Sequence, residues 1–276
     1  VFTSWKDVTC NGGNDGRATL VVNGGKSPYD FVWSNGFVQN DVSGPNATSI
    51  ATGLTAGLIT VQVTDAGGCQ VMAVIEIEQP APVGGTPVVV HPVSCYGGND
   101  GSALVVASGG TAPYTYLWSN GQNTFMADHL TAGNHTVTIT DYNRCTATVY
   151  VTVPGPQAPL AVTASGIDVK CFGTSTGMAT VTSVTGGTPP YSYSWNTTPV
   201  QTSATAVNLA AGIYTVTVTD KNNCSTTATA VVSQPATPVT LGTPVVTDAD
   251  CSGNQTGGVQ LSASGGTGTL NYKLST

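Results

Sequence analysis

The heptapeptide Cys10-Asn-Gly-Gly-Asn-Asp-Gly16 decides how this chain is organised, because it recurs three more times in modified form. The later copies are Cys95-Tyr-Gly-Gly-Asn-Asp-Gly101, Cys171-Phe-Gly-Thr-Ser-Thr-Gly177 and Cys251-Ser-Gly-Asn-Gln-Thr-Gly257. The cysteines that open the four copies are 85, 76 and 80 residues apart. That spacing suits a small independent domain and is too long for one rung of a solenoid. We therefore predict repeats at 1–82, 83–157 and 158–237 and a truncated fourth repeat at 238–276.

The composition indicates an all-β protein and excludes several classes of partner. Charged residues make up 8% of the chain, while Gly and Pro supply 34 and 16 of the 276 residues. Such a chain suits short strands joined by tight turns rather than helices. The net charge of −7 and the absence of a basic patch argue against nucleic acid as a partner. No apolar run approaches the roughly 20 residues of a membrane helix, so we expect no membrane insertion in this segment.

An aromatic strand follows the first cysteine in each complete repeat. Its copies are Pro28-Tyr-Asp-Phe-Val-Trp33, Pro113-Tyr-Thr-Tyr-Leu-Trp118 and Pro190-Tyr-Ser-Tyr-Ser-Trp195. The three aromatic side chains of each copy stand at positions i, i+2 and i+4, so they share one face of the strand. We predict that Trp33, Trp118 and Trp195 are core residues.

A second alternating strand completes the pattern of each repeat. It runs through Leu54–Asp65, Leu130–Asp141 and Leu209–Asp220, with aliphatic residues on one face and mostly Thr and Gln on the other. One buried and one wet face are typical of an antiparallel sandwich. Each repeat ends in Gln79-Pro80, Val153-Pro154 or Gln234-Pro235, where proline ends the strand and stiffens the junction. We therefore predict a tandem array of small immunoglobulin-like antiparallel β-sandwich domains, with about six or seven strands each.

Each complete repeat contains two cysteines, and we predict one disulfide within each. The predicted pairs, Cys10 with Cys69, Cys95 with Cys145 and Cys171 with Cys224, are 59, 50 and 53 residues apart. Closing a loop of that length stabilises a small domain by about 4 kcal/mol in the chain-entropy model. Such disulfides indicate an oxidising, extracellular setting. We expect Cys251 to pair with a cysteine beyond the last residue, in a longer protein.

The cysteines have two other interpretations. Six reduced structural cysteines in a cytosolic protein are the first. A zinc site is the second, and it is disfavoured because no CxxC motif or cluster of His accompanies the cysteines.

Taken in order, these motifs resemble the SprB repeat family of cell-surface gliding and adhesin proteins of Bacteroidetes. Gly109 to Gly121 and Leu209 to Asp220 lie nearest to the family pattern. The chain departs from it at Asn11 and Ser252, which replace the aromatic residue after the cysteine. Ile59 and His135, which stand where the third repeat has a tyrosine, are further departures. The resemblance implies a secreted, surface-displayed filament for adhesion or gliding motility, exported by the type IX secretion system.

One motif resembles a catalytic site by its letters alone. Gly173-Thr-Ser-Thr-Gly177 matches the GxSxG nucleophile elbow, which requires a strand-to-helix turn and a later Asp and His. Here the motif lies in a turn between β-strands, and His91, His129 and His135 all precede it. We predict no catalytic residue, no enzyme activity and no cofactor.

Calcium is the alternative role for the acidic residues. Asp15 and Asp100 lie in Asn-Asp-Gly turns, whereas Asp65 and Asp141 end the strand before the second cysteine. A disulfide within each repeat would bring these two loops together, so that their carboxylates could converge on a cation. An Asx-turn, in which the Asp side chain accepts a backbone N–H, explains the same residues without metal.

The leading functional hypothesis is a non-catalytic extracellular repeat region of a large surface adhesin or gliding-motility filament. It would act as a mechanically stable spacer and multivalent display. Its expected partners are neighbouring repeats of the same chain and a surface polysaccharide or other cell-surface component. The alternatives are a stalk or carbohydrate-binding segment of a secreted hydrolase, and a self-assembling extracellular fibre subunit.

Overall fold

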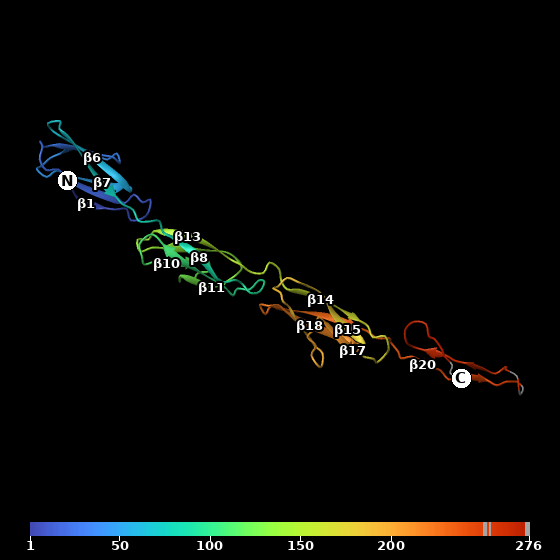
Figure 1. Ribbon diagram of the computed structural model, residues 1–276. Coiled ribbons are helices and arrows are strands. Elements are labelled where there is room, and N and C mark those ends of the chain that lie inside the picture. The colour runs from blue at the N-terminus through green and yellow to red at the C-terminus, as the bar shows by residue number, and fades with distance from the viewer. Residues whose placement is uncertain (251–252, 254, 274–276) are drawn as a thin grey trace. The chain divides into compact units, whose positions relative to one another are not determined.

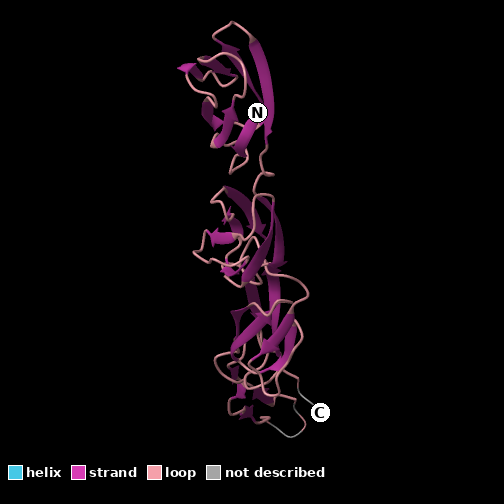
Figure 2. Ribbon diagram, turned by 90° about the vertical axis from the view of Figure 1, so that its left-hand side faces the viewer, coloured by secondary structure: helices cyan, strands magenta, loops and turns pink. Residues whose placement is uncertain are grey.

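A computed structural model describes residues 1–250, 253 and 255–273, and every regular element in that part of the chain is a β-strand (Figure 1, Figure 2). The chain forms two compact units, Val1–Val93 with Asn99–Pro154, and Ser94–Gly98 with Gly155–Thr276. The predicted all-β class is confirmed. The described residues contain no helix of the length and apolar character needed to cross a membrane.

The first repeat is a sandwich of two antiparallel sheets. One sheet has the order β1-β2-β5 and the other has the order β4-β3-β6-β7. Their bounds are β1 (Phe2–Lys6), β2 (Gly16–Val21), β3 (Tyr29–Trp33), β4 (Val38–Val42), β5 (Thr48–Leu54), β6 (Gly57–Asp65) and β7 (Gln70–Ile77). Leu20 and Leu54 from the first sheet share a core with Trp33 and Val61 from the second. Buried and more exposed residues alternate along β2, β3 and β6, as the sequence pattern predicts.

The second and third repeats are built in the same way from two three-stranded sheets each. The second repeat pairs its strands in the orders β11-β9-β8 and β10-β12-β13, and the third in the orders β14-β15-β17 and β16-β18-β19. The strands of the second repeat are β8 (Gly84–His91), β9 (Gly101–Ser108), β10 (Thr115–Trp118), β11 (Met126–Leu130), β12 (Gly133–Thr140) and β13 (Thr146–Val153). Those of the third are β14 (Ala161–Ile167), β15 (Gly177–Thr185), β16 (Ser192–Trp195), β17 (Thr205–Leu209), β18 (Gly212–Thr219) and β19 (Ser225–Val232).

The fourth repeat contributes two short antiparallel pairs in its described part. β20 (Thr240–Leu241) pairs with β23 (Ala263–Ser264), and β21 (Val245–Thr247) pairs with β22 (Gly258–Gln260). The repeat boundaries drawn from the sequence stay a prediction.

The aromatic strand of each complete repeat points its tryptophan into the core. Trp33, Trp118 and Trp195 are only 2%, 2% and 1% exposed. Each is paired with a buried valine of the next strand of its sheet, Val61, Val137 or Val216. The indole N–H donates to Ser49 Oγ at 2.9 Å, Thr124 O at 2.8 Å or Ser203 O at 3.0 Å. Because the polar edge of the ring has a partner, the ring can be buried completely.

Replacing Trp118 by Ala should lower the free energy of unfolding by about 3–5 kcal/mol, because it empties the centre of the core of the second repeat. Tyr150→Ala is the matched control, since that ring is exposed on a strand of the same repeat, and should change the value by less than about 0.5 kcal/mol. Chemical denaturation of the oxidised proteins measures both. Equal effects of the two substitutions would contradict this account of the core.

Candidate functional site

The cysteines of different repeats are bonded to each other, and this is the main correction to the sequence analysis. Cys10 is bonded to Cys145 and Cys95 to Cys224, with Cα–Cα distances of 5.6 and 5.7 Å. Cys69 and Cys171 are exposed free thiols. The predicted pairs Cys10–Cys69, Cys95–Cys145 and Cys171–Cys224 are therefore wrong. Cys251 lies outside the described residues, so its predicted pairing stays untested.

The length of one strand explains why pairing within a repeat fails. Cys69 comes directly before β7, whereas the turn at Cys10 lies just beyond the other end of that strand. There the Gly12 N–H donates to Gln79 Oε1 at 2.8 Å, and Asn11 Nδ2 donates to Pro80 O at 3.0 Å. Eight strand residues span about 26 Å. A disulfide needs Cα atoms within about 7 Å, so the two cysteines of one repeat cannot meet.

The other complete repeats have the same separation. In the second, the Val93 N–H donates to Pro154 O, beyond the end of β13, and Cys145 directly precedes that strand. In the third, the Gly173 N–H donates to Gln234 Oε1 at 3.0 Å, beyond the end of β19. The first cysteine of a repeat therefore meets the second cysteine of the repeat that follows it.

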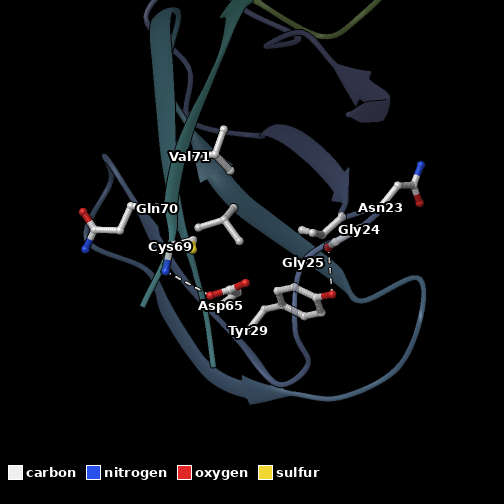
Figure 3. A pocket seen from close by; sticks show the side chains of 10 residues that line it. Asn23, Gly24, Gly25, Tyr29, Asp65, Cys69, Gln70 and Val71 are labelled. Carbon is white, nitrogen blue, oxygen red and sulfur yellow. Dashed lines mark hydrogen bonds between the residues drawn. The ribbon is translucent and has the colours of Figure 1, made fainter. Parts of the chain in front are cut away.

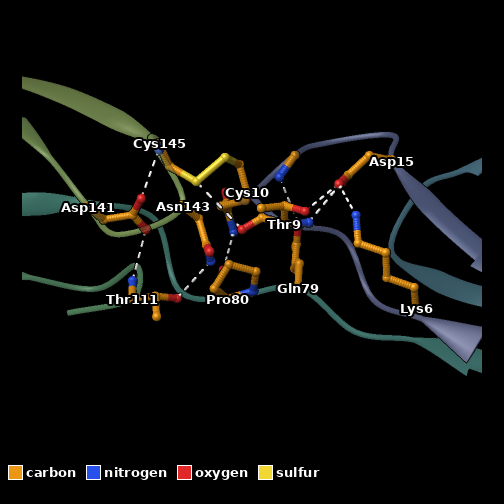
Figure 4. Close-up of a disulfide and its surroundings, with 12 residues drawn as sticks. Lys6, Thr9, Cys10, Asp15, Gln79, Pro80, Thr111, Asp141, Asn143 and Cys145 are labelled. Atoms are coloured by element: carbon orange, nitrogen blue, oxygen red, sulfur yellow. Dashed lines mark hydrogen bonds and ion pairs between the residues drawn. A yellow bond between two sulfur atoms is a disulfide. The ribbon is translucent and has the colours of Figure 1, made fainter. Parts of the chain in front are cut away.

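The first bridge is surrounded by hydrogen bonds that fix both of its ends (Figure 4). On the side of the second repeat, Asp141 accepts the backbone N–H of Cys145 at 2.8 Å and that of Thr111 at 2.8 Å. Asn143 Nδ2 donates to Thr111 Oγ1 at 3.1 Å. On the side of the first repeat, the bonds to Gln79 and Pro80 hold the cysteine turn in place. Both cysteines of the bridge are thus positioned by hydrogen bonds to the turns in which they lie.

The second bridge repeats this arrangement with one extra contact. Asp220 accepts the N–H of Cys224 at 2.9 Å and that of Thr188 at 2.8 Å. Asn222 Nδ2 donates to Ser94 O at 3.1 Å, directly beside Cys95. A side chain of the third repeat thus holds the backbone next to the cysteine that it receives.

The aspartate that ends the long strand of each repeat ties the Gly-Gly turn to the turn of the second cysteine. In the first repeat Asp65 accepts three backbone N–H groups, from Lys26 at 2.9 Å, Gly67 at 2.8 Å and Cys69 at 2.9 Å. Donors aimed at a carboxylate favour its charged form, and those from Lys26 and Cys69 are the main cause that lowers the pKa of Asp65. The Asx-turn interpretation thus describes this aspartate.

The calcium interpretation loses its geometric basis, since the disulfide that would join Asp15 to Asp65 does not form. Asp15 instead lies 2.7 Å from Lys6 Nζ and accepts the Thr9 N–H at 2.8 Å. Hydrogen bonds from Lys6 and Thr9 hold the pKa of Asp15 well below its usual range. Asp141 is committed to backbone N–H groups, and Asp100 also has an interaction partner. Within residues 1–250, 253 and 255–273, no three His, Cys, Asp or Glu side chains gather into a metal site.

The heptapeptide with the GxSxG spacing forms the cysteine turn of the third repeat. Its Gly173 N–H donates to Gln234 in the same way as Gly12 donates to Gln79. Ser175 is exposed between β14 and β15, in a turn between two strands. The strand-to-helix turn that a nucleophile elbow requires is not what surrounds this serine.

Cutting the backbone between two repeats should leave the protein in one piece until it is reduced. A specific protease site inserted between Gly155 and Pro156 lies between Cys95 and Cys224 in the sequence, so the bridge retains both fragments. Electrophoresis should show one band without reductant and two with it. Two bands without reductant would support pairing within repeats and contradict the structure. Uncut protein is the control.

The contribution of Asp65 to stability should disappear in acid. Because its pKa is lower in the folded chain than the ordinary value of about 3.9, its stabilising effect is full above that pH and is lost as the pH falls through the lower value. The melting temperature of Asp65→Asn should therefore lie below that of the unchanged protein at pH 7, and the difference should shrink as the pH falls below about 3.9. Glu76→Gln, an exposed strand residue, controls for the loss of one charge. A melting difference that does not vary with pH would contradict this role.

Several solved structures resemble the chain at low similarity. Three N-terminal domains of the outer capsid protein Hoc of bacteriophage RB49 share 14% identity, with a TM-score of 0.34 over 84% of this chain and 99% of that one. Invasin, a bacterial integrin-binding protein, shares 15% identity, with a TM-score of 0.32 over 86% and 61%. A tetra-tandem repeat from the extending region of a large adhesion protein shares 14%, with a TM-score of 0.25 over 94% and 86%. Because these scores are below 0.5, we base no argument on them.

A family model matches the chain in four places. None of the curated proteins compared matches the chain. The family model of the SprB repeat matches residues 3–37, 88–123, 163–199 and 243–276, which together make up just over half of the sequence. Each matched segment begins in or near the first strand of a repeat and includes the first cysteine of that repeat. The chain thus belongs to the SprB repeat family.

Proposed function

We propose that this chain is a non-catalytic extracellular repeat region of a large surface adhesin or gliding-motility filament. It acts as a mechanically stable spacer, and its similar repeats present the same kind of binding surface several times. Membership of the SprB repeat family supports the surface location. The two disulfides support an oxidising compartment, because such bonds rarely persist in the cytosol. Export by the type IX system and a surface polysaccharide or another cell-surface component as partner belong to the same proposal.

The observation that carries the proposal is that the two disulfides overlap along the sequence. Cys95 lies between Cys10 and Cys145, and Cys145 lies between Cys95 and Cys224. Between Cys10 and Cys224 every point of the backbone is therefore bridged by at least one disulfide. Each bridge closes a loop of about 130 residues, for which the chain-entropy model gives a stabilisation on the order of 5 kcal/mol.

The bridges also limit how far the chain can be stretched. The shortest covalent path from Val1 to Thr276 crosses both disulfides. It follows nine residues to Cys10, fifty from Cys145 back to Cys95 and fifty-two from Cys224 to the end, which is 111 in all. Even with every strand unfolded, most of the backbone would thus lie outside the stretched path as long as both disulfides are intact.

A carbohydrate-binding role for the tryptophan that recurs in each complete repeat is not favoured. Trp33, Trp118 and Trp195 are buried in the cores of their repeats, so they cannot form a flat platform on which a sugar ring stacks. Load bearing needs no such surface. It needs covalent continuity and strands paired antiparallel along their length, and both are present in the complete repeats.

Pulling single molecules by their ends should show the effect of the bridges directly. Fully unfolded, the oxidised chain should extend to about 390 Å and the reduced chain to about 960 Å, at about 3.5 Å per residue. A variant with Cys10→Ser and Cys95→Ser should reach the longer length without reductant. Equal lengths with and without reductant would contradict the proposal.

A further inference from the structure

The first repeat carries an open groove beside a free thiol (Figure 3). Its volume is about 220 Å³, and its lining includes Val22, Gly24, Gly25, Tyr29, Val63 and Cys69. The Tyr29 hydroxyl donates to Gly24 O at 2.9 Å, and Asp65 accepts the N–H of Cys69. The walls of the groove are therefore held by the same bonds that order the Gly-Gly turn.

In the second repeat, the chain itself covers the corresponding Gly-Gly turn. The Gly110 N–H donates to Ala81 O at 2.8 Å. A Cβ atom built on Gly109 would lie 1.9 Å from Pro82 O, and one on Gly110 would lie 2.6 Å from Val83 Cγ2. The extended segment Ala81-Pro82-Val83 thus lies against the glycines, which leave no room for side chains.

The third and fourth repeats hold an equivalent segment in the same way. A Cβ on Gly186 would lie 2.1 Å from Pro159 O, and one on Gly187 would lie 3.0 Å from Leu160 Cδ1. On Gly265 and Gly266 the nearest atoms belong to Pro238 at 2.0 Å and Val239 at 2.7 Å. Each segment has proline followed by an aliphatic residue and lies just ahead of the first strand of its repeat.

The first repeat has the same Gly-Gly turn, but no Pro-aliphatic segment in the described part of the chain lies against it. Within 4 Å of a Cβ on Gly24 there is nothing, and the three atoms nearest to a Cβ on Gly25 belong to Asp65 and Tyr29. Both glycines nevertheless have positive φ values, 88° and 84°, as their counterparts do. Tyr29 also makes the same hydroxyl bond as Tyr114 and Tyr191. The conformation is therefore the one that receives a proline-containing segment in the other repeats.

Cys69 gives a second, independent indication of the same partner. It occupies the position of Cys145 and Cys224, both of which are bonded to the first cysteine of a preceding repeat. Cys69 itself is exposed and free. In the second and third repeats, a Pro-aliphatic segment lies on the Gly-Gly turn, and the second cysteine is bonded to the first cysteine of the preceding repeat. In the first repeat, the groove and Cys69 are the positions where these two contacts would be made.

We propose that the groove and Cys69 together bind the C-terminal end of another SprB-type repeat, attached in tandem ahead of Val1. The Pro-aliphatic tail of that repeat would lie on Gly24 and Gly25, and the thiol of its cysteine turn would form a disulfide with Cys69. With glutathione disulfide as oxidant, two thiols lose two electrons and two protons, one S–S bond forms, and two glutathione molecules are released. This inference concerns assembly and is independent of what the array displays or how much load it bears.

The register of the first strand shows that such a tail would reach the groove. Phe2 pairs with Leu20 in the place where Pro87 pairs with Val105 in the second repeat. Val83, which touches Gly110, lies four residues ahead of Pro87. An attached segment would therefore bring its aliphatic residue to the groove three positions before Val1, with no loop between them.

The test is a longer chain in which a copy of residues 83–162 precedes Val1. That copy ends in Ala-Pro-Leu-Ala-Val, which places its Pro-Leu pair at the groove. Its tyrosine equivalent to Tyr96 is changed to Phe, so that mass spectrometry distinguishes its cysteine peptide from the native one. After oxidation with glutathione disulfide, the marked peptide should be bonded to the Cys69 peptide, and Cys69 should resist alkylation.

Three results of this experiment would overturn the inference. The marked cysteine could pair within its own copy, Cys69 could stay open to alkylation, or Cys69 could bond between two molecules and give dimers without reductant. The pulling experiment on the original chain does not depend on any of these outcomes, so the two proposals fail separately.

A shorter variant tests the groove if the longer chain does not fold. Ala-Pro-Leu-Ala-Val placed directly before Val1 should slow hydrogen exchange of the Gly25 amide at least about tenfold, because that N–H gains the partner that Gly110 has. Gly-Ser-Asp-Gly-Ser at the same place is the control and should leave the exchange rate unchanged. Equal rates in the two extended chains would contradict the proposed site.

Discussion

The length of the last strand in each complete repeat constrains the rest of the structure. Because β7, β13 and β19 have eight residues each, the cysteine turn and the second cysteine of one repeat lie at opposite ends of a sandwich about 26 Å long. A covalent bond between them is impossible without dismantling the sheet. Each thiol can be bonded only beyond its own repeat, so oxidation joins repeats rather than closing them.

Small β-sandwiches have limited cores, and these repeats supplement theirs at the ends. A repeat of about eighty residues buries a modest share of its surface, so loops and termini need further support. The aspartate that precedes the second cysteine provides it by binding the Gly-Gly turn through backbone N–H groups. The same turn then receives the Pro-aliphatic segment in the later repeats. Stability and assembly thus depend on one group of residues at one end of the sandwich.

The sequence predicted the elements of the fold better than their connections. Alternating aromatic and aliphatic residues predicted strands with one buried face, and the three tryptophans lie in the cores. The separations of 59, 50 and 53 residues describe loop lengths and contain no information about which end of a sandwich each cysteine occupies. The strand residues between Cys69 and Gln79 can be counted in the sequence, but the position of the Cys10 turn beside Gln79 is a tertiary contact that the sequence does not show. The calcium interpretation lost its premise for the same reason, because it relied on a disulfide to bring Asp15 and Asp65 together.

The most direct test of bonding between repeats is a peptide mass map of the oxidised protein, digested without reduction after its free thiols have been alkylated. Linked peptides should contain Cys10 with Cys145 and Cys95 with Cys224, while Cys69 and Cys171 should be alkylated. Linked peptides that contain Cys10 with Cys69, or Cys95 with Cys145, would contradict the account, because each repeat would then close on itself.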